Sequence, residues 1–113
     1  MSEDKKDLVR VTHILDAMAL LDQYLGEVSE EEFLHSDLLI NLAARQIAII
    51  GEAMDSFSVE FREKYSDLPY QKAKDMRNFL IHEYFDVSDK IVWDTYKEDI
   101  PLLKSGLEKA LEE

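Results

Sequence analysis

Cysteine is absent from this sequence, and its 113 residues include only three glycines and two prolines. Without cysteine the chain can form no disulfide, thiolate metal site or cysteine nucleophile, and a reducing compartment fits this composition. So few glycines and prolines disfavour a β fold with many turns and favour helices joined by short connections. No apolar run approaches the roughly 20 residues of a membrane-spanning helix, and the amino terminus lacks a signal core. We therefore expect a single soluble, cytoplasmic domain over residues 1–113, with no membrane association.

Basic residues are also in deficit, because 13 Lys and Arg face 25 Asp and Glu, which gives a net charge of −12. This balance argues against a protein that coats nucleic acid, since phosphate binding depends on Lys and Arg. It leaves room for a small local basic site. It favours a basic partner protein or a transient contact with nucleic acid.

Four helical segments are predicted from apolar residues that recur at spacings of three and four. Ser29 and Glu32 form a capping box at the start of the second segment, and Ser88 caps the fourth. Pro101 predicts a kink or a break near Ile100. The sequence therefore predicts an all-α fold, an antiparallel four-helix up-and-down bundle. Its segments are residues 4–25, 29–57, 69–84 and 89–112, with a short helical turn at 60–64.

The second segment has two unusual features. The run Ile47–Ile50 is apolar around most of the helix, and a helix that is apolar all round is buried all round. In so short a chain, this predicts that a second protein surface covers the run. Arg45 and Glu52, seven residues apart on one line of the helix, predict an ion pair or an interface contact.

The third segment carries the side chains with chemistry. On an ideal helix with about 100° per residue, Arg77 and Tyr84 share one line and Asn78 and His82 share another. Ile81 lies between these lines, away from the side that faces the core. A cation, a phenol, an amide and an imidazole around an exposed apolar residue suit a face that a second subunit covers.

A histidine and an arginine suffice for one metal-free reaction. Histidine takes or gives a proton near neutral pH, and arginine binds phosphate and stabilises charge developing on it. Together they allow an RNA 2′-OH to attack its neighbouring phosphate, which leaves a 2′,3′-cyclic phosphate. Arg77 and His82 lie about 140° apart on an ideal helix. We therefore expect two copies related by a two-fold axis to bring the two groups together.

Each of these residues also has a purely structural interpretation. Arg77 could be a surface residue paired with Asp75 or Glu83. His82 could cap the carbonyls at a helix end, and Tyr84 could be a half-buried aromatic residue with a hydrated hydroxyl.

The spacing of Arg77, His82 and Tyr84 resembles the Arg-x4-His-x-Tyr signature of the HepT toxins in the HEPN superfamily. The resemblance covers nearly the whole chain. Residues 50–53 (Ile-Gly-Glu-Ala) are similar to the second-helix signature of that family. Residues 92–93 and 99–103 are similar to its fourth-helix pattern.

This resemblance implies a homodimeric, metal-independent RNA endonuclease that needs no cofactor, does not act on DNA and serves as the toxin of a type VII toxin–antitoxin pair. Arg77 and His82 would be the catalytic residues in a cleft between protomers, and Asn78 would support them. Tyr84 would receive AMP from a cognate MNT-type nucleotidyltransferase antitoxin, which would block RNA by charge and bulk. The alternative is a non-enzymatic nucleotide- or partner-binding module, as the substrate-binding or antitoxin subunit of a nucleotidyltransferase.

Overall fold

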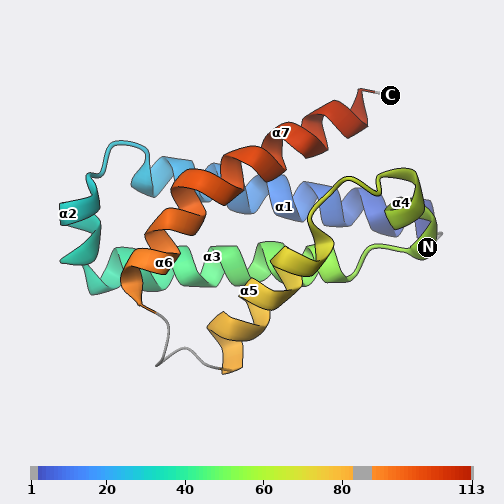
Figure 1. Cartoon of the computed structure of the whole chain (residues 1–113). Helices are drawn as coiled ribbons and strands as arrows, with labels where there is room; N and C mark the ends of the chain where they lie inside the picture. Colours follow the sequence, from blue (N-terminus) through green and yellow to red (C-terminus); the bar gives the residue numbers. More distant parts are fainter. Residues whose placement is uncertain (1–2, 83–87, 113) are drawn as a thin grey trace.

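The computed structural model describes residues 3–82 and 88–112, and among these residues there are helices and short connections but no strand. The predicted all-α class is therefore confirmed. In chain order the elements are α1 (Glu3–Leu25), α2 (Glu30–Leu34), α3 (Asp37–Asp55), α4 (Val59–Lys64), α5 (Tyr70–His82), α6 (Asp89–Asp94), the π-helical turn η2 (Thr95–Asp99) and α7 (Ile100–Leu111) (Figure 1).

The predicted second segment is two helices, so its expected continuity over residues 29–57 is wrong. Ser29 and Glu32 form the predicted capping box, but it opens the short α2 only. A second cap follows at Ser36, whose Oγ accepts a hydrogen bond from the Leu39 amide at 3.2 Å. Because a capping serine satisfies the free amides of a new first turn, α3 begins there.

The predicted break near Ile100 takes the form of a π-helical turn. In η2 the Ile100 amide donates to the Thr95 carbonyl, five residues back, and α7 then begins with Pro101 in its first turn. Proline has no amide hydrogen to donate to the preceding turn, so a widened turn before it avoids an ordinary helical bond that could not form. Ser88 caps α6 through the Ile91 amide, as predicted. The predicted turn at 60–64 is α4.

Helix α3 lies between α1 and α5 and packs mainly on these two helices (Figure 1). Helices α1 and α3 run side by side in opposite directions, and α7 crosses over α1. The chain's own helices cover the Ile47–Ile50 run only in part, so the second protein surface expected over the rest of it stays a prediction. Ile47 and Ile50 are buried, and the two residues between them are half-buried.

One continuous core joins α1, α3, α6 and α7. Trp93 packs against Phe33 with tilted rings whose centroids lie 5.0 Å apart, and both Trp93 and Tyr96 are buried. The large side chains that are fully buried in this core are Phe33, Ile14, Met18, Leu21, Leu25, Ile50, Met54, Leu107 and Val92. Within residues 3–82 and 88–112, no helix is both long and apolar enough to cross a membrane.

Candidate functional site

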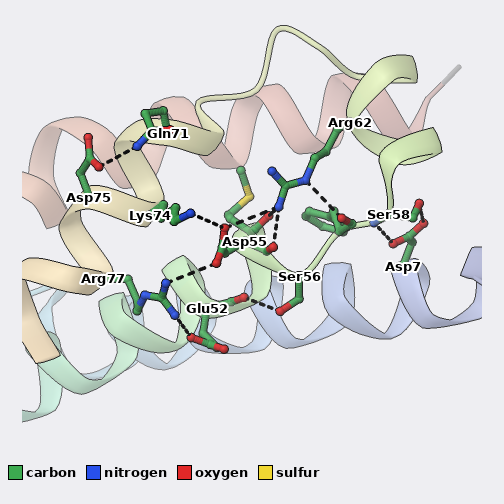
Figure 2. Close-up of polar contacts among 12 residues, drawn as sticks. Asp7, Glu52, Asp55, Ser56, Ser58, Arg62, Gln71, Lys74, Asp75 and Arg77 are labelled. Atoms are coloured by element: carbon green, nitrogen blue, oxygen red, sulfur yellow. Dashed lines mark hydrogen bonds and ion pairs between the residues drawn. The ribbon is translucent and has the colours of Figure 1, made fainter.

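Arg77 lies in the middle of α5 and turns toward α3, with only 16% of its side chain exposed. Its guanidinium forms ion pairs with Glu52 and with Asp55, where Nη2 lies 3.3 Å from Oδ2 (Figure 2). The position predicted for Arg77 on the outer face is therefore wrong. Asp75, one partner considered from the sequence, accepts a hydrogen bond from Gln71 at 2.8 Å instead.

Gly51 on α3 is the reason that Arg77 can lie between the two helices. A Cβ at Gly51 would come within 2.6 Å of the Arg77 Cβ and 2.7 Å of the Ala73 carbonyl oxygen. Only a residue without a side chain allows α5 to approach α3 so closely. The approach brings the stem of Arg77 into the helix interface and directs its guanidinium to the next turn of α3.

Asp55 is shared by three cations from α4 and α5. Its carboxylate lies 3.3 Å from Arg77, 3.6 Å from Arg62 and 3.8 Å from Lys74 (Figure 2). Together with Glu52, which is more exposed, Asp55 forms what we call the α3 carboxylate pair. Three cations against two carboxylates leave this cluster with a formal charge of +1, on a chain whose net charge is −12.

Arg62 has a structural role at the end of α3. Its guanidinium donates to the carbonyls of Asp55 and Phe57, and it lies 5.3 Å from the centre of the Tyr70 ring. Burial raises the pKa of Tyr70 to about 12, against the opposing effect of the Arg62 charge. The Tyr70 hydroxyl therefore stays protonated and donates to the Tyr65 carbonyl at 2.8 Å, which fixes the start of α5 on the α4 connection.

His82 is the last residue of α5 and is exposed. It lines a shallow hollow with Asn78, Phe79 and Asp75, and Arg77 is not among the lining residues. The predicted Asn78–His82 line thus exists as one surface. Within a single chain, however, the structure does not bring Arg77 and His82 to a common site, in agreement with their angular separation on an ideal helix.

The exposed end of α5 also carries apolar side chains. Ile81 is 54% exposed, as predicted, and Phe79 is exposed beside His82. Tyr84 lies outside the described residues. Exposed apolar side chains next to a polar hollow are typical of a surface that meets another molecule.

The sequence predicted an ion pair or an interface contact for Arg45 and Glu52, and Glu52 forms its ion pair with Arg77 of α5. Arg45 is exposed and forms no ion pair within the described part of the chain, so the expected Arg45–Glu52 contact is absent. Asp55 was not expected at the site at all. The sequence did contain an indication that both residues belong to one site. Glu52 and Asp55 are three residues apart and therefore lie on one side of α3, and they follow the only glycine of that helix.

The fold and this site define an all-helical protein with an Arg-x4-His pair, in which the arginine is held by carboxylates and the histidine is exposed. Residues 14–110 match the family described as "Ribonuclease HepT-like". The chain belongs to this HepT-like ribonuclease family. No solved structure matches the chain with significance.

Three relatives with assigned names are similar over most of the chain. "Gamma-glutamylcyclotransferase and putative RNase MJ0434" of Methanocaldococcus jannaschii is 38% identical over 110 residues, which cover 96% of this chain and 50% of that protein. "Putative RNase TTE0752" of Caldanaerobacter subterraneus is 37% identical, covering 88% of this chain and 89% of the relative. "Probable ribonuclease HepT" of Thermococcus cleftensis is 34% identical, covering 96% and 97%. The chain thus spans half the length of the first relative and nearly all of the third.

Proposed function

We propose that this chain is a metal-independent endoribonuclease whose active site is assembled from Arg77 of one copy and His82 of a second. On this proposal its helices form the four-helix HEPN bundle, with α2 and α4 as additions and α6, η2 and α7 as one broken helix. The observation that carries the proposal is the separation of Arg77 and His82 within one chain, on a helix whose exposed end bears Phe79 and Ile81.

In the proposed reaction His82 accepts the proton of an RNA 2′-OH as that oxygen attacks the adjacent phosphorus. The bond from phosphorus to the 5′-oxygen breaks, and the leaving oxygen takes a proton from water. The products are a 2′,3′-cyclic phosphate and a 5′-OH. Arg77 stabilises the charge that develops on the non-bridging oxygens. The α3 carboxylate pair keeps its guanidinium in one orientation, and Asn78 supports His82 in the shared hollow.

The test is cleavage of single-stranded RNA by purified variants. We expect His82→Ala to lower the rate by about 10²–10⁴-fold, because it removes the proton acceptor. We expect Arg77→Ala to lower it by a similar factor. His35→Ala is the matched control, since His35 is exposed directly after α2 and its ring hydrogen-bonds the Glu31 carbonyl. Full cleavage by His82→Ala, or loss of activity on adding EDTA, contradicts the proposal.

We further propose that the nuclease acts as a toxin and that an MNT-type nucleotidyltransferase antitoxin silences it by adding AMP to Tyr84. An added phosphate close to His82 in sequence would repel RNA and occupy the cleft. Coexpression with a candidate nucleotidyltransferase, followed by intact-mass measurement, tests this step. The wild type is expected to gain the mass of AMP and lose cleavage. Tyr84→Phe should do neither.

One observation favours the second candidate function, a nucleotide- or partner-binding module without catalysis. The net charge of −12 disfavours the binding of a polyanion such as RNA more than the binding of a single nucleotide. A module of this kind would bind ATP or AMP measurably and cut no RNA, and Arg77→Ala would weaken the nucleotide binding.

A further inference from the structure

A groove of about 420 Å³ runs between α1 and α3, and it shares Glu52 with the site described above. Its volume lies in the range of small-ligand sites, about 300–1,000 Å³, so a nucleotide fits into it. One wall comes from α1 and the other from α3. Its lining residues are Lys6, Val9, Arg10 and His13 from α1, Ile49, Glu52 and Ala53 from α3, and Ser56 directly after α3.

The two walls differ in charge. On α1, Lys6, Arg10 and His13 recur at spacings of four and three, which places them along one side of the helix. The α3 wall contributes a single acid, Glu52, and its carboxylate is paired with Arg77. Among the residues that line the groove, Lys6 and Arg10 thus carry two formal positive charges against the one negative charge of Glu52.

The acid closest in sequence to this wall offsets part of its charge. Asp7 is buried and accepts hydrogen bonds from the Ser58 amide at 2.9 Å and from the Ser58 hydroxyl at 2.5 Å. Arg10 also forms an ion pair with Asp7, with 3.4 Å between Nη1 and Oδ1. Asp7 thus serves mainly to fasten α1 to the start of α4, and it is not among the residues that line the groove.

The groove also has surfaces that suit a base or a ribose. Val9 is 41% exposed, and Ile49 and Ala53 add apolar surface from α3. His13 supplies an exposed ring, and histidine is one of the residues on which unpaired RNA bases stack. Cations beside an apolar floor and a ring are the combination that proteins use for single-stranded nucleic acid.

The groove and the catalytic arginine share a residue. Glu52 lines the groove and binds the Arg77 guanidinium, so a strand with one phosphate at Arg77 can continue past Glu52 into the groove. We propose that the groove between α1 and α3 binds the single-stranded RNA next to the cleaved phosphate. Lys6 and Arg10 contact its phosphates and His13 contacts a base. This inference rests on the proposed nuclease function, and it assigns the path of the substrate strand.

The test uses the cleavage-inactive His82→Ala chain and a short fluorescein-labelled single-stranded RNA, with binding followed by fluorescence anisotropy over a series of NaCl concentrations. Lys6→Gln with Arg10→Gln is the groove variant. Lys104→Gln with Lys109→Gln on α7 changes the net charge equally at exposed positions outside the groove and is the matched control.

Each lost phosphate contact lowers the salt dependence of single-strand binding by about 0.7 in the slope of log K against log [salt]. We therefore expect the groove variant to bind more weakly and to lose about 1.4 from this slope, while the α7 variant keeps the slope of its parent. Val9→Glu, which leaves the Arg10–Asp7 contact in place, should also weaken binding by putting an acid into the groove.

The inference is overturned if the groove variants and the α7 variant bind RNA alike, or if the His82→Ala chain binds no RNA. Circular dichroism melts of each variant separate a folding defect from a binding defect. If the wild type cleaves RNA and the groove variants cleave it equally well, the groove does not bind the substrate, and the proposed nuclease function is unaffected. If the wild type does not cleave RNA but binds it through the groove, the proposed nuclease function is wrong and the groove remains an RNA-binding site.

Discussion

The two ends of α5 differ sharply in how firmly the protein holds them. At the start and middle of the helix, Tyr70 is bonded to the α4 connection and Arg77 lies on Gly51 with its guanidinium between two carboxylates. At the other end, His82 is exposed beside Ile81. A six-residue motif thus joins one group that the fold has already oriented to another that faces outward.

This difference suits a site that two copies complete. The group that stabilises charge benefits from a fixed position, because preorganised charges need no reorganisation during the reaction. The proton acceptor has to reach a substrate held by a different chain, so it belongs on an exposed surface. Changes at the two ends should therefore affect stability and activity in different proportions.

The largest stability difference is expected between Arg77→Ala and His82→Ala. Removing the Arg77 side chain leaves a void in the α3–α5 interface and takes away the cation paired with Glu52 and one of the three paired with Asp55, at a cost of about 1–3 kcal/mol. Removing the exposed His82 side chain should change stability by less than about 0.5 kcal/mol. Urea unfolding of both variants measures the contrast. Equal effects would mean that the two ends are held alike.

Gly51→Ala tests the close approach that places Arg77. A methyl group there meets a Cβ and a backbone oxygen, neither of which can rotate away, so overpacking costs about 1–3 kcal/mol. The higher helix propensity of alanine offsets up to about 1 kcal/mol of this loss in stability. Gly106→Ala is the control, since its nearest neighbour is the end of the flexible Leu68 side chain at 3.0 Å. Thermal melts should show a lower Tm for Gly51→Ala only; no loss there contradicts the packing described.

The smallest effects separate the members of the α3 carboxylate pair. Asp55→Asn leaves three cations without their common counter-charge and should cost about 1 kcal/mol at low salt. Because salt screens the resulting repulsion, the loss should shrink in concentrated NaCl. Glu52→Gln, at a side chain that is 60% exposed, should cost less. If urea unfolding shows a larger loss of stability for Glu52→Gln than for Asp55→Asn, then Glu52 is the main partner of Arg77.

Helix caps and the broken fourth segment were predictable because their causes are local. The capping box at Ser29, the cap at Ser88 and the disruption ahead of Pro101 each depend on residues within a few positions. The break at Ser36 had the same kind of signal, a serine followed by an aspartate, but the surrounding apolar pattern concealed it. Neighbouring residues alone therefore determine where most of these helices begin.

The orientation of Arg77 could not be read from the periodicity of its own helix. On an ideal wheel Arg77 falls outside the core sector, and only the missing side chain of Gly51, on another helix, brings it into an interface. The partners in the α3 carboxylate pair likewise depend on tertiary packing. The exposed positions of His82 and Ile81 followed from the wheel because nothing in the described chain packs over them.

Mixing two inactive variants tests the shared active site most directly. If each site combines Arg77 of one copy with His82 of the other, an Arg77→Ala/His82→Ala heterodimer regains one intact site of two. An equal mixture, unfolded and refolded together, should then recover about a quarter of the wild-type RNA cleavage rate, because half of its dimers are mixed. A refolded mixture that stays as inactive as its components, while refolded wild type recovers its rate, would contradict the account.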